Sequence, residues 1–176
     1  MTYPNFIILI GLPSSGKSEI GLLLAQKLGY DFTDSDSLII DHCKDKSKNV
    51  QTIQQCFSIL GEKEFRNLEK KKIKELFQTK EQKFSVISTG GGAIIDSDNR
   101  KIFKSMGTIV FIDTPLLVIK SRIQSQSERP LFGTNILERL NQLNSERRPI
   151  MLEIADITVD GEDSADEVCT KIISQL

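Results

Sequence analysis

The sequence lacks tryptophan, has a single histidine and contains only three cysteines. The one histidine, His42, argues against a His-based catalytic triad and against a histidine-rich metal centre. Cys43, Cys56 and Cys169 lie far apart and do not have the spacing of metal ligands. An odd number of scattered cysteines suits a reducing compartment, so we expect a cytoplasmic protein whose cysteines fill core or surface positions.

An excess of charge of one sign is also missing, since the chain has 23 Lys and Arg residues, 24 Asp and Glu residues and a net charge of −1. Such a balance offers no broad cationic face, so we expect no nucleic-acid partner. No apolar run approaches the length of a membrane span, and residues 1–4 lead directly into an apolar run, so we expect neither a membrane segment nor a targeting peptide. The 176 residues are enough for one compact domain over 1–176, which we expect to be a monomer.

The most informative stretch that is present runs from Gly11 to Ser18 and has the pattern G-x-x-x-x-G-K-S of a phosphate-binding loop. An apolar run at 6–10 precedes it, and apolar residues at helical spacing follow it. Gly11 and Gly16 let the backbone approach a ligand without an intervening Cβ atom. Lys17 can reach the β- and γ-phosphates and the Ser18 hydroxyl can bind Mg²⁺, so the pattern predicts a nucleotide-phosphate site.

Strand and helix patterns alternate along the chain. The strand candidates are 6–10, 31–33, 84–88, 108–112 and 157–159, and helices are expected at 17–28, 35–43, 50–60, 62–77, 99–104, 115–123, 136–147 and 164–174. This alternation predicts an α/β domain with three layers, a parallel sheet covered by helices on both faces. Ligands of such folds bind at the carboxyl ends of the strands. Residues 121–135 are a polar connection between two helices, and we predict that they form a lid over the site.

Two carboxylates follow the second strand candidate in Asp34-Ser35-Asp36. One of them can bind Mg²⁺, directly or through water, and the other can accept a substrate hydroxyl and take its proton during phosphoryl transfer. The alternative is that Ser35 or Asp36 caps the helix that follows. Beside a phosphate-binding loop we favour the catalytic interpretation.

Three consecutive glycines, Gly90, Gly91 and Gly92, follow the strand candidate 84–88. Three glycines in a row raise the conformational entropy cost of folding, so we expect the backbone there to pass close to another group. One interpretation is a ligand bound under the N–H groups, and the other is a tight strand-to-helix turn. The two interpretations are compatible. By contrast, we assign residues 69–72 to the solvated face of an amphipathic helix, and a lone helical arginine such as Arg66 is typical of a surface charge.

Taken in order, these motifs resemble those of the shikimate kinase family, nearly from end to end. The motifs are Gly11 to Ser18, Asp34-Ser35-Asp36, Gly61-Glu62 with Phe65-Arg66 and Glu69, Thr89-Gly90-Gly91-Gly92, Arg129-Pro130-Leu131, and Arg147-Arg148-Pro149 with Ala155-Asp156. The resemblance implies transfer of the ATP γ-phosphoryl group to the 3-hydroxyl of shikimate, in aromatic amino-acid biosynthesis. It also implies a five-stranded parallel sheet of the nucleoside-monophosphate-kinase type.

The resemblance assigns roles by position. It implies catalytic roles for Lys17, Asp36 and Arg129, and ATP binding by Gly11, Ser14, Ser15, Gly16, Lys17, Ser18, Glu19, Arg122 and Arg129. In that scheme Arg122 lies near adenine and Arg129, in the lid, reaches the phosphates. Ser18 and Asp34 are the implied Mg²⁺ ligands. Shikimate would be held by Asp36, Arg66, Gly90, Gly91, Gly92 and Arg147, with the two arginines on its carboxylate.

Three positions depart from the family pattern, and they bear on the alternatives. Ser14 stands where glycine is common, Glu19 where Ser or Thr is common, and Met151 where tyrosine is common. Together the three departures raise the question of an altered ATP affinity. Ser14 and Glu19 are the only hints of a catalytically silent binding domain. A kinase of the same architecture for gluconate or a nucleoside monophosphate is the other alternative, against which the carboxylate pair, Arg66 and the triple glycine argue. No Asn-Lys-x-Asp motif of a GTPase is present.

Overall fold

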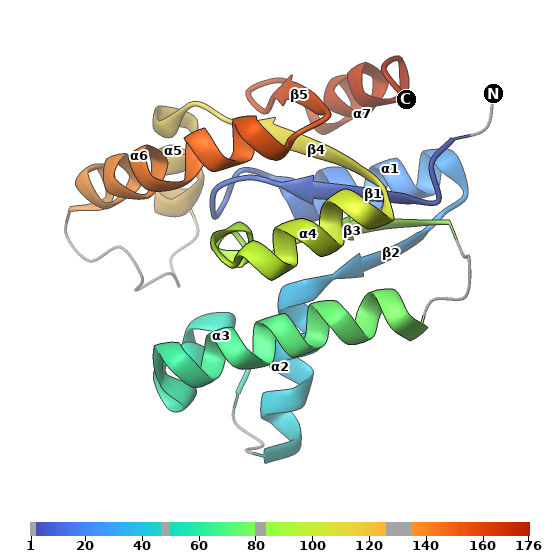
Figure 1. Ribbon diagram of the computed structural model, residues 1–176. Helices are drawn as coiled ribbons and strands as arrows, with labels where there is room; N and C mark the ends of the chain where they lie inside the picture. The colour runs from blue at the N-terminus through green and yellow to red at the C-terminus, as the bar shows by residue number, and fades with distance from the viewer. Residues whose placement is uncertain (1–2, 47–49, 80–83, 126–134) are drawn as a thin grey trace.

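Five parallel strands run through the middle of the protein in the order β2-β3-β1-β4-β5 (Figure 1). The computed structural model describes residues 3–46, 50–79, 84–125 and 135–176. The strands are β1 (Phe6–Ile10), β2 (Asp31–Asp34), β3 (Ser85–Ser88), β4 (Thr108–Asp113) and β5 (Ile157–Asp160). The central strand β1 pairs on both sides, with Ile8 opposite Ile87 of β3 and Ile109 of β4. The predicted α/β class with a parallel sheet is confirmed.

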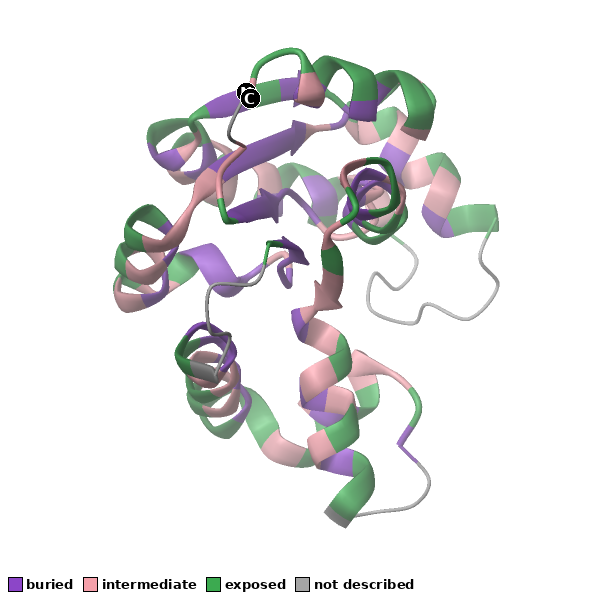
Figure 2. Cartoon of the chain, turned by 90° about the vertical axis from the view of Figure 1, so that its right-hand side faces the viewer, coloured by how far each residue is buried: buried purple, intermediate pink, exposed green. Residues whose placement is uncertain are grey.

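Helices cover both faces of the sheet, because side chains alternate between the faces along each strand. The helices are α1 (Lys17–Leu28), α2 (Ser35–Lys46), α3 (Ile53–Thr79), α4 (Ser97–Met106), α5 (Leu116–Ser125), α6 (Ile136–Ile154) and α7 (Ala165–Ile173), with a short 3₁₀ helix at Ala93–Ile95. Ile7 and Leu9 of β1 pack toward α1 and α7, where Leu24 and Val168 are fully buried. Figure 2 shows that burial is concentrated in the central strands of the sheet and in the helix faces turned toward them.

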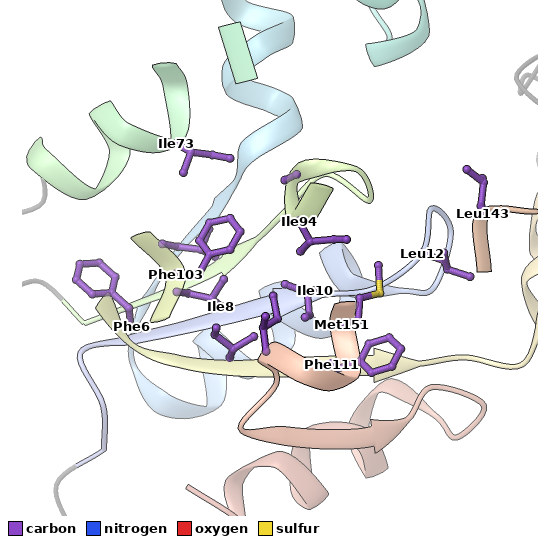
Figure 3. Packing of buried hydrophobic residues seen from close by; sticks show 14 of the residues in the cluster. Phe6, Ile8, Ile10, Leu12, Ile73, Ile94, Phe103, Phe111, Leu143 and Met151 are labelled. Carbon is purple, nitrogen blue, oxygen red and sulfur yellow. The ribbon is translucent and has the colours of Figure 1, made fainter. Parts of the chain in front are cut away.

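The opposite face of the sheet carries the larger core. There Phe6, Ile8 and Ile10 of β1 pack in one cluster with side chains from α3, α4, α5 and α6. Figure 3 shows Met151 of α6 among the side chains of β1 and β4, near Phe111. Met151 is fully buried, so the residue that departs from the family pattern at this position is a core residue.

A third, smaller cluster joins α2 to the first half of α3, beyond the β2 edge of the sheet. Its buried members are Ile39, Cys43, Val50, Cys56 and Phe65. Helix α3 changes direction at Gly61, whose φ of 72° and ψ of 163° are accessible to glycine but not to other residues. The break between the helices expected at 50–60 and 62–77 is therefore present at the predicted place.

The prediction that the helix beginning at 136 ends before Pro149 is wrong, because α6 continues to Ile154. Proline removes one helical hydrogen bond and normally ends a helix. Here Met151 and Ile154 beyond it are buried in the core, and Arg148 before it binds both carboxylate oxygens of Asp113, Nη2 to Oδ2 at 2.7 Å. Tertiary contacts on both sides of the proline thus hold the helix together.

The boundaries of the predicted lid also change. Helix α5 extends to Ser125 and α6 begins at Ile136, so residues 121–125 are helical and Ile123 is buried. The rest of the predicted lid, including Arg129, lies almost entirely outside the described residues. Among the described residues, no helix combines the length and the apolar character needed to cross a membrane.

Candidate active site

The phosphate-binding loop connects β1 to α1 at the carboxyl edge of the sheet. A Cβ atom on Gly11 would lie 2.7 Å from Ser15 Oγ, so a side chain has no room there. Gly16 has a φ of 97° and Ser14 a φ of 63°, both in the left-handed region. Ser14 therefore adopts a conformation that glycine adopts more easily. The serine that stands here in place of the glycine common in the family has a conformational cost.

Lys17 lies folded over this loop, with its side chain almost fully buried. Its Nζ atom donates to the carbonyl oxygen of Leu12 at 2.8 Å and to Ser15 Oγ at 3.3 Å. The ammonium group is thereby held over the loop, beside the N-terminal end of α1. By contrast, Glu19 is exposed in the first turn of α1, where its negative charge interacts favourably with the helix dipole.

Oxygen atoms from three parallel strands or their loops meet at the ends of β2 and β3. Ser18 Oγ donates to Asp34 Oδ2 at 2.5 Å and lies 3.3 Å from Ser88 Oγ. The other carboxylate oxygen, Asp34 Oδ1, accepts the backbone N–H of Asp36 at 2.9 Å. Hydroxyl and carboxylate oxygens are the ligands that Mg²⁺ prefers, so Ser18 and Asp34 fit the predicted metal site.

Asp36, in the first turn of α2, has the most perturbed carboxyl group of the site. Burial raises its pKa to about 7, with a further contribution from the negative charge of Asp34, and the ammonium of Lys17 opposes the shift. A carboxyl group with a pKa near neutral pH is matched to accepting a proton during a reaction at that pH. The geometry is therefore compatible with both expected roles, a Mg²⁺ ligand at Asp34 and a proton acceptor at Asp36. Ser35, between them, accepts the N–H of Gly90.

The triple glycine is a tight turn that passes close to side chains on three sides. A Cβ atom would lie 2.5 Å from Asp36 Oδ1 at Gly90, 2.7 Å from Pro13 Cδ at Gly91, and 2.7 Å from both Nη atoms of Arg66 at Gly92. The turn is fixed by the N–H of Gly90, which donates to Ser35 Oγ at 2.9 Å. The interpretation of the glycines as a tight turn is confirmed, because the backbone turns sharply and forms a wall shared with Asp36 and Arg66. Their predicted contact with a ligand stays a prediction.

Two guanidinium groups lie along the same wall. Arg66 Nη1 binds Glu69 Oε2 at 2.7 Å, and Arg147 Nη1 donates to the carbonyl oxygen of Gly91 at 3.0 Å. Burial and the positive charge of Arg66 lower the pKa of Arg147, so the two cations are close enough to repel each other. The Nε atom of Arg147 is buried without a hydrogen-bond partner in the described part of the chain. Two adjacent cations with an unsatisfied donor have the chemistry to bind an anion.

Glu69, which pairs with Arg66, is the residue at this site whose environment the sequence pattern predicts wrongly. The pattern assigns it to the solvated helix face, but its side chain is only 3% exposed and burial raises its pKa. On a helix, a carboxylate three residues after an arginine lies close enough to pair with it. This spacing is the feature of the sequence that could have predicted the Arg66–Glu69 ion pair. Ser35, considered only as a helix cap, is buried and holds the glycine turn instead.

Arg122 also lies at the phosphate-binding loop. Its Nη1 atom donates to the carbonyl oxygen of Ser15 and its Nη2 atom to that of Gly161, each at 3.0 Å. It therefore bridges the phosphate-binding loop and the connection from β5 to α7. The predicted site residues that the structure describes thus all lie at the carboxyl edge of the sheet. Arg129 is not among the described residues.

Comparison with known proteins identifies the family of this chain. Residues 13–176 match the family model described as shikimate kinase. The chain belongs to the shikimate kinase family. Members of this family are ATP-dependent kinases.

Similar proteins cover nearly the whole chain. A shikimate kinase of Actinobacillus pleuropneumoniae is 38% identical over 172 residues, which are 97% of this chain and 94% of that protein. The structure of the Acinetobacter baumannii shikimate kinase in complex with shikimate is similar with a TM-score of 0.85 at 33% identity, covering 98% of this chain and 92% of the other. The Aquifex aeolicus shikimate kinase structure is similar with a TM-score of 0.78 at 38% identity, over 97% of this chain and 95% of the other.

Proposed function

We propose that this chain transfers the γ-phosphoryl group of ATP to the 3-hydroxyl of shikimate, giving shikimate 3-phosphate and ADP. The observation that carries the proposal is the wall formed by Asp36, Arg66, Arg147 and the glycine turn. Guanidinium groups suit a carboxylate, and the Asp36 carboxylate suits a hydroxyl donor. Shikimate is a small carboxylate with several hydroxyl groups, so its two kinds of functional group match the two halves of this wall.

In the proposed reaction, different side chains bind the substrate, accept its proton and stabilise the phosphate charge. Arg66 and Arg147 bind the carboxylate and fix the orientation of the ring. Asp36, in its ionised form, accepts the proton of the 3-hydroxyl as that oxygen bonds to the γ-phosphorus and the bond to the β–γ bridging oxygen breaks. Lys17 and the N–H groups of the phosphate-binding loop stabilise the negative charge that passes to ADP.

The metal ion of this reaction fits the oxygen atoms at the end of β2. We propose that the Ser18 hydroxyl and the Asp34 carboxylate hold Mg²⁺, whose chemistry when bound is to neutralise charge on the β- and γ-phosphate oxygens. In the metal-free protein, the negative charge of Asp34 also contributes to the raised pKa of Asp36.

Further parts of the proposal concern the surroundings of the site. We infer that Arg122 lies against adenine and that Arg129, outside the described residues, reaches the phosphates when the segment between α5 and α6 closes. Water is then excluded, which limits hydrolysis of ATP without transfer. The three free cysteines are buried thiols, as suits a reducing compartment, and we infer a monomeric cytoplasmic enzyme.

The experiment that tests the function is measurement of ADP release with three acceptors in parallel: shikimate, gluconate and AMP. We expect turnover with shikimate alone, and phosphorus NMR of the product should identify the 3-phosphate. The Asp36→Asn variant is the matched control, because it keeps the size of the side chain and removes the proton acceptor. Preferential phosphorylation of gluconate or AMP would replace the proposal with another kinase activity, and no turnover with any acceptor would indicate a silent binding domain.

A further inference from the structure

A buried contact at the end of β4 connects the sheet to the phosphate-binding loop. Thr114, the residue that follows β4, is 4% exposed, and its Oγ1 atom donates to the carbonyl oxygen of Ser15 at 3.0 Å. Ser15 is fully buried. The same carbonyl oxygen accepts Nη1 of Arg122 at 3.0 Å, so both of its lone-pair positions have a donor. No sequence motif singles out Thr114, which lies 99 residues from Ser15.

The orientation of the Ser15 carbonyl determines where the next N–H points. A trans peptide is planar, so the carbonyl of Ser15 and the N–H of Gly16 point in opposite directions. A carbonyl held toward Thr114 therefore turns the Gly16 N–H away from β4. Successive N–H groups of such a loop line the concavity that binds phosphate oxygens, which makes this peptide orientation a condition for phosphate binding.

The loop needs an external anchor because its own conformation is strained. Ser14 and Gly16 both have a positive φ, of 63° and 97°, on either side of Ser15. A non-glycine residue in the left-handed region persists only where the surrounding structure holds it. The hydrogen bonds from Thr114 and Arg122 hold the carbonyl of the Ser15–Gly16 peptide, which lies next to Ser14 in the same loop.

The position of Thr114 is itself fixed by a glycine on the next strand connection. A Cβ atom on Gly161 would overlap Thr114 Oγ1 and would lie 2.8 Å from Ile112 Cγ2. The N–H of Gly161 donates to the carbonyl oxygen of Asp113 at 3.2 Å, and its carbonyl oxygen accepts Nη2 of Arg122. The Thr114 hydroxyl is thus confined between the phosphate-binding loop and Gly161. This confinement keeps its hydrogen bond directed to the carbonyl oxygen of Ser15.

We propose that Thr114 is a positioning residue for the nucleotide phosphates. Its hydroxyl holds the Ser15–Gly16 peptide in the orientation that donates to phosphate, and it acts through this backbone without touching the nucleotide. The proposal depends on the phosphate-binding function of the loop and is independent of the identity of the acceptor. It predicts an effect on phosphate affinity, separate from any effect on shikimate.

Three substitutions separate the hydroxyl of Thr114 from its shape. Thr114→Val keeps the shape and removes the donor, Thr114→Ala removes both the donor and the methyl group, and Thr114→Ser keeps the donor. We expect the Val and Ala variants to bind ADP about three- to tenfold more weakly, the range that one neutral hydrogen bond supports while Arg122 still donates. The Ser variant should bind ADP within about twofold of the parent protein.

The measurements are the Kd of ADP by calorimetry, the inhibition constant of inorganic pyrophosphate against ATP, and the KM of shikimate. Because the proposed effect acts at the phosphates, ADP and pyrophosphate should weaken by the same factor in the Val and Ala variants. The KM of shikimate should stay constant, which also reports that the acceptor site is folded.

Five results would overturn the proposal. Parent-like ADP binding by the Val and Ala variants would show that the hydroxyl is dispensable. Weak binding by the Ser and Ala variants alone would assign the effect to the methyl group, and weak binding by Val alone would assign it to a steric clash. An ADP defect without a pyrophosphate defect would place the effect at the nucleoside, and an equal loss of shikimate affinity would show a general loss of structure.

Discussion

Substitution of Gly92 by alanine tests whether the glycine turn sets the position of Arg66. The added Cβ atom would lie 2.7 Å from both Nη atoms of Arg66 and 3.0 Å from its Cζ, whereas ordinary contacts begin at 3.4 Å. The guanidinium therefore has to move by about 0.7 Å, the difference between 3.4 and 2.7 Å, or the turn has to open. Gly92 has a φ of −105° and a ψ of −5°, which alanine adopts without strain, so the clash is the main perturbation.

The displaced guanidinium cannot move without loss. Arg66 Nη1 is bound to the buried carboxylate of Glu69 at 2.7 Å, so a shift away from the turn weakens that ion pair or the contact with the acceptor. A charge-assisted hydrogen bond contributes roughly 1.5–3 kcal/mol. Loss of most of one such contact corresponds to an increase in the KM of shikimate of about tenfold or more, with little change in the affinity for ADP.

The assay is a double-mutant cycle with Arg66→Ala, in which shikimate KM, kcat and the Kd of ADP are measured for all four proteins. If Gly92→Ala acts through Arg66, it should have almost no further effect on the KM in the Arg66→Ala background. A KM within twofold of the parent for Gly92→Ala would refute the reasoning. So would an equal loss of affinity in both backgrounds, because the effect would then be independent of the guanidinium.

Three other predictions concern the charged groups of the site. Lys17→Ala should lower kcat by on the order of 10²–10³ with little change in melting temperature, and near-normal turnover would contradict its role at the phosphates. Arg147→Ala should raise the KM of shikimate, because it removes one of the two paired cations, and it should leave the Kd of ADP unchanged; the opposite pattern would place Arg147 at the nucleotide. Folding raises the pKa of Asp36 from 3.8 to about 7, so the ionised group destabilises the folded state increasingly as the pH rises through this interval. Asp36→Asn should therefore melt above the parent at pH 8, with the difference closing toward pH 4, and should have a much lower kcat with ADP binding retained; a melting difference independent of pH would contradict the raised pKa.

Much of the fold and part of the site could be predicted because the signals are local in the chain. The run Gly11 to Ser18 needs no distant partner, since its glycine spacing and the flanking strand and helix already define a phosphate-binding loop. The break at Gly61 is likewise visible in the sequence, because a glycine between two helical patterns has a local conformational meaning. The alternation of strands and helices predicts a parallel sheet for the same reason.

The wrong predictions depended on contacts between distant segments. Helix α6 passes Pro149 because Met151 is buried against the sheet and Arg148 pairs with Asp113, 35 residues away. Glu69 points inward because the glycine turn and Arg66 surround it, although the neighbouring lysines give its segment the composition of a solvated face. A periodic pattern describes one helix at a time, and it does not state which element will pack on which face.

The sequence by itself determined the loop that binds phosphate, the class of the fold and the family, since each follows from residues close together or from the order of motifs. Only the tertiary structure brought Arg66 and Arg147 to the same glycine turn, placed Asp36 where burial raises its pKa, and set Thr114 against Ser15. The physical reason is the strand order β2-β3-β1-β4-β5, which makes neighbours of strand ends that are far apart in the chain. The chemistry of the site arises at that shared edge, where charges and donors from separate connections come within hydrogen-bonding distance of one another.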